Sequence, residues 1–365
     1  MIPMVQTARN VEEAFQLGLF LMQDSRCVRE QSRNGWVTVW NGPVITTTER
    51  PMERVLFNPL RNANPFFHLF ESLWMLSGRE DLPWVAYFNK RMTEYSDDGG
   101  KTQPAAYGFR WREYFGHDQL EMVIEELKRD PNTRRVVLGM WDPGSTDHPG
   151  DLARAFAGSK DVPCNTQCYF TLRDAKLHMG VTCRSNDLVW GAHGANAVHF
   201  SVLLEYVAAR VGVEVGTMTQ FSWNYHLYDG VLKAAPMEVA SKAVDHYGQS
   251  EVEVTPLFTP QTIETFEAEL PIFMEWASPE NRGGLDIKRR FKRPPQFADP
   301  FLREVAKPML RVWDLYKAAD LEGASSFAHL IRPGSDWQRA ALEWTNRRLG
   351  KDYTYWHNLQ KERGR

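Results

Sequence analysis

The strongest constraint on the fold is an alternating stretch between residues 168 and 185. The segments CYFTL and LHMGVTCRS flank the four residues RDAK. In the second segment apolar and polar side chains alternate, which is the period of a strand with one buried face. The apolar face consists of Leu177, Met179, Val181 and Cys183, and the other face of His178, Gly180, Thr182 and Arg184. Two such runs around a short turn predict a hairpin, with Arg184 at its end.

Helices are predicted before and after this hairpin. Residues 9–24 and 64–77 are helical in pattern, and the second segment is apolar on most faces and is followed by a glycine. Asp118 can cap the helix DQLEMVIEELKRDP, whose apolar residues keep helical spacing. Asn196 can cap a long apolar helix, AVHFSVLLEYVAARVGV. A buried helix on each side of a hairpin predicts a layer of helices against a sheet.

The rest of the chain completes this prediction. RRVVLGMW (134–141) and the region of GTMTQFSWNYHLY are typical of strands, whereas 92–117 and 142–161 are predicted to be irregular. Beyond residue 232 the pattern becomes polar and helical, notably at 299–320 and 335–348. We therefore predict an α/β (α+β) fold with a mixed, twisted sheet and helices. Its sheet-containing domain spans 1–232, and 233–365 forms the C-terminal part with a helical extension.

Composition limits the functional classes. The chain has 365 residues, with 43 basic and 46 acidic side chains, so it offers no bulk basic face for nucleic acid. The first residues lack a basic leader, and the run LGLFLM is too short for a signal peptide or a membrane span. Four cysteines in so long a chain predict free thiols and a cytoplasmic address. The spacing C-x3-C without a second pair argues against a metal site.

Cys164 is the candidate nucleophile. It follows a proline at the start of a predicted strand, where a side chain can project into a cleft, and neighbouring arginines could lower the pKa of its thiol. The alternative for any cysteine is a small buried hydrophobe. Cys168 and Cys183 fit that alternative well.

Several polar residues suit a phosphate monoester and its reaction, each beside a structural alternative. Arg134–Arg135 and Arg184–Ser185 combine guanidinium forks with a hydroxyl, although arginine pairs also occur as solvated or salt-bridged residues. Glu71, in an apolar helix, is either a general acid–base carboxylate or a paired core residue. Asn196 can cap a helix and also present its amide to a ligand. His226 and Tyr228 point to one face and could bind a sugar hydroxyl or pack as half-buried aromatics.

Taken together, these segments resemble the folate-dependent thymidylate synthase and deoxycytidylate hydroxymethylase family. Order and spacing agree from about residue 30 to 230. The motifs that carry the resemblance are E-x-L-W at 71–74, AYGFRWR at 106–112, DQL at 118–120, RRVVLGMW at 134–141, VPCN at 162–165, RSND at 184–187, Gly191 with Asn196, and HLY at 226–228. The resemblance implies that 1–232 is the catalytic domain.

The resemblance also implies roles for these residues. Cys164 would add to C6 of a pyrimidine nucleoside monophosphate, and the resulting enolate would attack the methylene of 5,10-methylenetetrahydrofolate. Glu71, Tyr107 and Asn165 would complete the catalytic group, with the first two serving proton transfers. Arg33, Arg184 and Ser185 would bind the 5′-phosphate together with Arg134 and Arg135 of the other subunit, which implies a homodimer. Asn196 would bind the base edge, His226 and Tyr228 the 3′-hydroxyl, and Asp187, Trp74 and Gly191 would line the folate site.

Departures from the family pattern bear on the product. Asn165 stands where thymidylate synthases have a histidine, Cys183 stands where they have a glutamine, and Leu-Pro-Pro-Cys has become Asp161-Val162-Pro163-Cys164. No counterpart is found for the tryptophan that lies over the folate, and more than 100 residues replace the short hydrophobic tail that seals the site. Hydride transfer needs a dry, closed site, whereas hydration needs an admitted water. The departures therefore favour a hydroxymethyl product; thymidylate synthesis and a non-catalytic nucleotide-binding regulator are the alternatives.

The base remains open between uracil and cytosine. GAHGAN has one residue more than the family between Gly191 and Asn196. An asparagine at the base edge favours dUMP, yet its amide could rotate to accept from N4–H of dCMP. A ribonucleotide is a further alternative.

Overall fold

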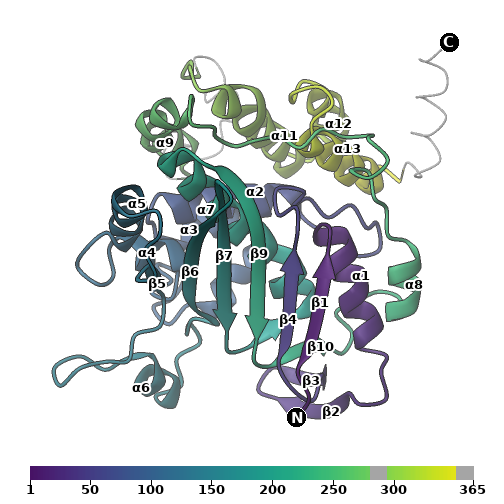
Figure 1. The fold of residues 1–365 in the computed structure, drawn as a ribbon. Coiled ribbons are helices and arrows are strands. Elements are labelled where there is room, and N and C mark those ends of the chain that lie inside the picture. Colours follow the sequence, from purple (N-terminus) through teal and green to yellow (C-terminus); the bar gives the residue numbers. More distant parts are fainter. Residues whose placement is uncertain (280–293, 351–365) are drawn as a thin grey trace.

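A mixed six-stranded sheet forms the centre of the molecule. The computed structural model describes residues 1–279 and 294–350. The strand order is β1-β4-β9-β7-β6-β5, with β1 parallel to β4, β7 parallel to β9, and the other neighbours antiparallel (Figure 1). The strands are Met4–Ala8 (β1), Val44–Thr48 (β4), Val137–Gly139 (β5), Asn165–Arg173 (β6), Lys176–Cys183 (β7) and Glu214–Ser222 (β9). The predicted fold class is confirmed.

The predicted hairpin is formed by β6 and β7. Its turn is Asp174–Ala175, whose φ angles of 49° and 59° are the left-handed pair that matches the twist of a two-residue hairpin. The apolar face of β7 is buried, with Leu177 and Met179 only 0% and 2% exposed. Cys168 and Cys183 are buried on the same side, as packing residues should be.

Helices cover one face of this sheet. The apolar helices are α2 (Pro65–Leu76) and α7 (Asn196–Val211), whose buried side chains share the main core with β6, β7 and β9. Asp118 accepts a hydrogen bond from the Glu121 N–H and so caps α5 (Gln119–Arg129), as predicted. The other N-terminal helices are α1 (Val11–Leu21) and α3 (Leu82–Phe88).

A second, smaller sheet lies beside the first. Its order is β2-β3-β10-β8, from strands Val28–Ser32, Gly35–Val39, Tyr225–Tyr228 and Asn186–Asp187. The predicted strand near 216–228 is therefore two strands, because the chain bends at 223–224 and enters the second sheet. This bend brings His226 next to Asp187, its partner in the parallel β8–β10 pair.

Some regions predicted to be irregular contain short helices. These are η1 (Lys90–Tyr95), α4 (Tyr107–Arg112) and α6 (Asp151–Phe156). Arg110 of α4 forms a buried ion pair with Asp151 of α6, 2.6 Å between Nη1 and Oδ2, so these helices depend on a contact that local pattern does not reveal. Conversely, the strand predicted at 134–141 forms a ladder only over three residues.

Most of the C-terminal helices gather at one end of the large sheet, whereas α8 (Pro236–Ser241) lies at the side, next to α1 (Figure 1). The others are α9 (Ile263–Ala277), η4 (Leu302–Ala306), α11 (Lys307–Lys317), α12 (Leu321–Ala328) and α13 (Asp336–Arg348). Phe66 of α2 contacts Trp313 and Trp344, with ring centroids 5.4 and 5.2 Å apart. The helical extension thus shares one core with the N-terminal part. Residues 351–365, the end of the predicted extension, lie outside the described residues.

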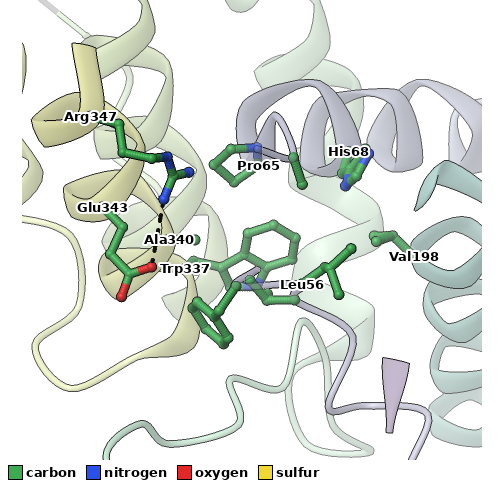
Figure 2. Close-up of a pocket in the computed structure, with 11 residues that line it drawn as sticks. Leu56, Pro65, His68, Val198, Trp337, Ala340, Glu343 and Arg347 are labelled. Atoms are coloured by element: carbon green, nitrogen blue, oxygen red, sulfur yellow. Dashed lines mark ion pairs between the residues drawn. The ribbon is translucent and has the colours of Figure 1, made fainter. Parts of the chain in front are cut away.

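A small pocket lies where α13 meets the rest of the molecule. Figure 2 shows Trp337, Ala340, Glu343 and Arg347 of α13 on one side and Pro65, His68 and Val198 on the other. His68 is one turn from Glu71 along α2, and Val198 precedes His199 on α7. The C-terminal helix α13 therefore packs near the stretch of α2 that contains Glu71.

The opposite face of the large sheet carries several exposed side chains. Tyr169 and its cross-strand partner Val137 are 41% and 45% exposed, and Val5 on the edge strand is 67% exposed. Side chains of the same face in β7 and β9, such as Thr182 and Thr219, are half-buried. Exposed apolar side chains on a sheet face that no helix of the described residues covers are typical of a surface that a partner covers.

Candidate functional site

Cys164 lies at the start of β6, beside the end of β7. Its carbonyl accepts from the Arg184 N–H, which joins the candidate nucleophile to the pair Arg184–Ser185 that was predicted to bind phosphate. Burial raises the pKa of the Cys164 thiol, and the charges of Arg184 and Arg33 oppose that shift without cancelling it. The two arginines do lower the pKa of the thiol, as the sequence suggested they could, but removal from water outweighs them and the net shift is upward.

Asn165 and Tyr107 form a hydrogen-bonded pair next to the nucleophile. The Nδ2 of Asn165 donates to the Tyr107 hydroxyl over 2.9 Å, and the Asn165 backbone N–H also points to it, at 3.3 Å. Asn165 is fully buried, and its Oδ1 has no hydrogen-bond partner in the described part of the chain. Burial raises the pKa of Tyr107. The pair thus offers a neutral phenol and a free amide oxygen, both beside Cys164.

Arg184 and Ser185 follow β7 directly. The Arg184 guanidinium donates to the carbonyls of Pro163 and Val162, at 2.9 and 3.1 Å, and so supports the loop before Cys164. Arg33, in the β2–β3 turn, donates to the Ser159 carbonyl at 3.3 Å. The charge of Arg33 also lowers the pKa of the Cys164 thiol.

Arg134 and Arg135 lie apart from this group. Both are exposed, beside a surface depression that Glu126, Arg129 and Asp130 also line. Neither guanidinium forms an ion pair with another residue of the described ranges. The positive charges of Arg134 and Arg135 could therefore bind an anion on a neighbouring molecule.

Glu71 is buried on α2 and faces His199, a residue that the sequence patterns did not single out. The distance from His199 Nε2 to Glu71 Oε2 is 2.8 Å, and both residues are buried. The contact lacks hydrogen-bond geometry, and neither ring nitrogen has another partner among the described residues. The signal in the sequence was a lone histidine on an apolar helix, which by itself indicates only burial.

Asn196 does not cap α7, contrary to prediction. The chain is already wound as a π-helix over Leu188–Ala195 (η2), and the Asn196 N–H donates to the Gly191 carbonyl five residues back. Asn196 is itself the first residue of α7, and the capping position is taken by Ala195, which makes no side-chain hydrogen bond. A π-turn holds one residue more than an α-turn, so it can accommodate the additional residue inferred in GAHGAN. The Asn196 side chain instead donates to Asn186 Oδ1 at 3.2 Å.

Gly191 is required by this arrangement. A Cβ at this position would lie 2.7 Å from Asn186 Oδ1 and 3.3 Å from Asn196 Nδ2. The glycine therefore gives two amide side chains room to meet.

Asp187, His226 and Tyr228 lie together in the small sheet. Asp187 Oδ1 accepts from the backbone N–H groups of Val189 and Trp190, while its buried Oδ2 has no hydrogen-bond partner in the described ranges. Burial raises the pKa of Asp187 and lowers that of His226. The rings of His226 and Tyr228 are in edge contact, with centroids 5.1 Å apart, so their predicted common face is confirmed.

Trp74 and Trp190 have opposite environments. Trp74 is 1% exposed in the core, and its indole N–H donates to the Asp81 carbonyl, so it presents no surface to a folate. Trp190 is 45% exposed next to Asp187, with the guanidinium carbons of Arg61 and Arg91 5.0 and 5.4 Å from its ring centroid. An exposed aromatic plane beside two cations can stack on a ring that carries anionic groups.

Two further classes of feature were searched for in the described ranges. No helix there is long and apolar enough to cross a membrane. No group of three or more His, Cys, Asp or Glu side chains there is arranged to hold a metal ion.

Comparisons with known proteins connect this geometry to a family. The thymidylate synthase family model matches residues 63–269, more than half of the chain. The deoxyuridylate hydroxymethyltransferase of Pseudomonas phage M6 is 43% identical over 352 residues, 93% of each chain.

Two other relatives match shorter parts. The deoxyuridylate hydroxymethyltransferase of Bacillus phage SP01 is 40% identical over 196 residues, 51% of this chain and 49% of that protein. A putative thymidylate synthase of Methanothermobacter thermautotrophicus is 32% identical over 217 residues, 59% of this chain and 88% of that protein. These matches confirm the predicted resemblance and the enzyme class, a folate-dependent transferase that acts at C5 of a pyrimidine nucleotide. The chain belongs to the thymidylate synthase family.

Proposed function

We propose that this enzyme converts dUMP to 5-hydroxymethyl-dUMP with 5,10-methylenetetrahydrofolate as co-substrate. The observation that carries this proposal is the 43% identity to a deoxyuridylate hydroxymethyltransferase across 93% of both chains. Because it covers 93% of the chain, the match extends beyond residue 269, where the thymidylate synthase family model ends. The names of the two phage relatives support the hydroxymethyl product that the sequence favours.

The chemistry follows from the groups around Cys164. Its thiolate adds to C6 of the uracil and turns C5 into an enolate carbon, which attacks the methylene of the folate. A base then removes the proton from C5 as the bond between the methylene and the folate nitrogen breaks, so that tetrahydrofolate leaves and an exocyclic methylene remains at C5. Water then adds to this carbon, the electrons move through the ring, and the bond between C6 and the Cys164 sulfur breaks. Tyr107, Asn165 and Glu71 would hold the waters and protons that these steps exchange.

The nucleotide would be bound at its phosphate and its sugar. Arg184, Ser185 and Arg33 would bind the phosphate, with Arg134 and Arg135 supplied by a second subunit across the uncovered sheet face. The exposed pair Tyr169 and Val137 supports a homodimer through that face. His226 and Tyr228 would bind the 3′-hydroxyl.

The folate would lie between Asp187 and Trp190. The free, buried Oδ2 of Asp187 suits the N–H groups of a pterin. Trp190 would stack on an aromatic ring of the folate, and Arg91 would meet its carboxylates. Free thiols at all four cysteines fit a cytoplasmic enzyme.

One experiment tests the product. The protein is incubated with methylenetetrahydrofolate and dUMP, and the nucleotide mass and the folate oxidation state are read together. Hydroxymethyl-dUMP with tetrahydrofolate is the expected outcome; dTMP with dihydrofolate would establish the thymidylate synthase alternative. Cys164→Ala should abolish tritium release from C5-labelled dUMP and retain dUMP binding. Absence of tritium release from any pyrimidine monophosphate in the wild type would favour a non-catalytic binding protein.

A further inference from the structure

Three buried amides are linked in series behind the base-binding side of the site. Gln220 Nε2 donates to the Ala192 carbonyl at 3.0 Å, and Asn186 Nδ2 approaches Gln220 Oε1 at 3.4 Å. Asn196 Nδ2 donates to Asn186 Oδ1 at 3.2 Å. Gln220 is 4% exposed, Asn186 1% and Asn196 8%, so water has little access to the series.

The series has a fixed polarity because it ends on a backbone carbonyl. A carbonyl oxygen only accepts, so the amide nitrogen of Gln220 must face Ala192. Its oxygen then faces Asn186, whose nitrogen turns towards it and towards Ser222 Oγ, at 2.9 Å. The Ser222 hydroxyl can donate or accept, so it does not fix the orientation of the Asn186 amide. Gln220 Oε1 can only accept, so it does fix that orientation. Each amide orients the next as far as Asn196.

We infer that Gln220 and Asn186 are positioning residues that fix the amide orientation of Asn196 and thereby select uracil over cytosine. The inference rests on the proposed function, in which Asn196 faces the base. One N–H of Asn196 is used by Asn186, which leaves its other N–H and its oxygen for the base. That combination matches O4, an acceptor, and N3–H, a donor, of uracil.

Cytosine needs the opposite arrangement. N4–H donates and N3 accepts, so Asn196 would have to turn its amide over and bring its oxygen against Asn186 Oδ1. To avoid this contact between two oxygens, Asn186 and then Gln220 would have to turn their amide groups over as well. The last rotation sets Gln220 Oε1 against the Ala192 carbonyl, where two acceptors meet in a buried site without a donor between them. The backbone thus opposes a rotation that an isolated asparagine could make freely.

The test is Gln220→Met, which keeps side-chain length and removes both polar groups. We expect the ratio of kcat/KM for dUMP to that for dCMP to fall about tenfold, the value of one buried hydrogen bond. Gln16→Met is the matched control, because Gln16 Nε2 donates to the Ala240 carbonyl at 3.1 Å in a part-buried position of α1. If both variants fold and the ratio of kcat/KM for dUMP to that for dCMP is the same in Gln220→Met as in Gln16→Met, the inference is overturned.

A second measurement separates this inference from the proposed reaction. In the Cys164→Ala background, which cannot turn over, the Kd values of dUMP and dCMP are compared with and without Gln220→Met. A preference for dUMP that weakens in the variant supports the inference even if the product is not hydroxymethyl-dUMP. Equal preference in both proteins contradicts it, whatever the product. If Gln220→Met fails to fold, Asn186→Ser in the same background provides the same comparison.

Discussion

The Nε2 of His199 lies 2.8 Å from Oε2 of Glu71, in the interior between α7 and α2. Glu71 was predicted as a proton-transfer residue, and His199 is the side chain that the fold places against it. Phe200, the next residue of α7, packs on the Tyr107 ring with centroids 5.8 Å apart, so the pair adjoins the Tyr107–Asn165 side of the site. A carboxylate with a histidine neighbour can pass a proton without becoming an isolated buried charge.

Glu71→Gln should therefore lower kcat by about 10²–10⁴-fold, the usual contribution of a positioned acid or base, with little change in the Kd of dUMP. His199→Leu should show part of this loss, and His199→Gln, which keeps a polar group near the position of Nε2, should recover some of it. Single-turnover rates with C5-tritiated dUMP measure the effect. If His199→Leu retains the wild-type rate at every pH, the histidine serves packing alone.

Arg33→Ala should raise the pKa of the Cys164 thiol further, because it removes one of the two positive charges that oppose the effect of burial. The rate of alkylation by iodoacetamide, followed from pH 7 to 10 at Cys164 by peptide mass, should shift to higher pH. Arg29→Ala is the control, since Arg29 lies in the same hairpin and pairs with Asp229 at the surface. An identical profile for both variants would remove Arg33 from the site.

Trp344→Ala should unfold or strongly destabilise the whole chain. Trp344 is 1% exposed and contacts Phe66 and Trp313. Its loss therefore leaves a cavity at the place where the extension packs against α2. The expected loss in free energy of unfolding is about 3–5 kcal/mol, and a single transition should persist. Leu330→Ala, at a position 64% exposed in the same region, should change little. Separate transitions for the extension and the sheet would show that the extension is a domain of its own.

Features that depend on neighbours in the sequence could be predicted from it. The alternation around β7 and the Asp118 cap are local, and the structure contains both. The helices α4 and α6 were missed because their stability depends on the long-range Arg110–Asp151 pair. The cap predicted at Asn196 was wrong because η2 runs directly into α7, so that Asn196 is the first residue of that helix.

The site residues also divide into those that a local motif reveals and those that depend on a distant partner. Residues in recognisable motifs could be predicted, and the fold brings Cys164, Asn165, Tyr107 and Arg184 together. His199 and Gln220 could not be predicted, since each stands in a helix or strand without a local motif that assigns it a partner. Their meaning comes from a partner far away in the sequence, Glu71 in one case and the Ala192 carbonyl in the other.

Asp161, three residues before the nucleophile, should make stability depend on pH. Its Oδ2 accepts from the Ala105 N–H at 2.7 Å, and burial raises the pKa of the carboxyl from 3.8 to about 6. The folded chain therefore binds this proton more tightly than the unfolded chain. The resulting contribution to stability is complete below about pH 4 and is lost as the pH rises through 6.

In Asp161→Asn this contribution is absent at every pH. The difference in free energy of unfolding, wild type minus variant, should thus be larger at pH 4 than at pH 7, by up to about 3 kcal/mol. Urea unfolding at a series of pH values measures it, and other titrating groups cancel in the difference. Asp147→Asn, at an exposed position, is the control. A difference that stays constant, or that grows towards pH 7, would show that Asp161 is ionised in the folded protein and is stabilised there by its neighbours.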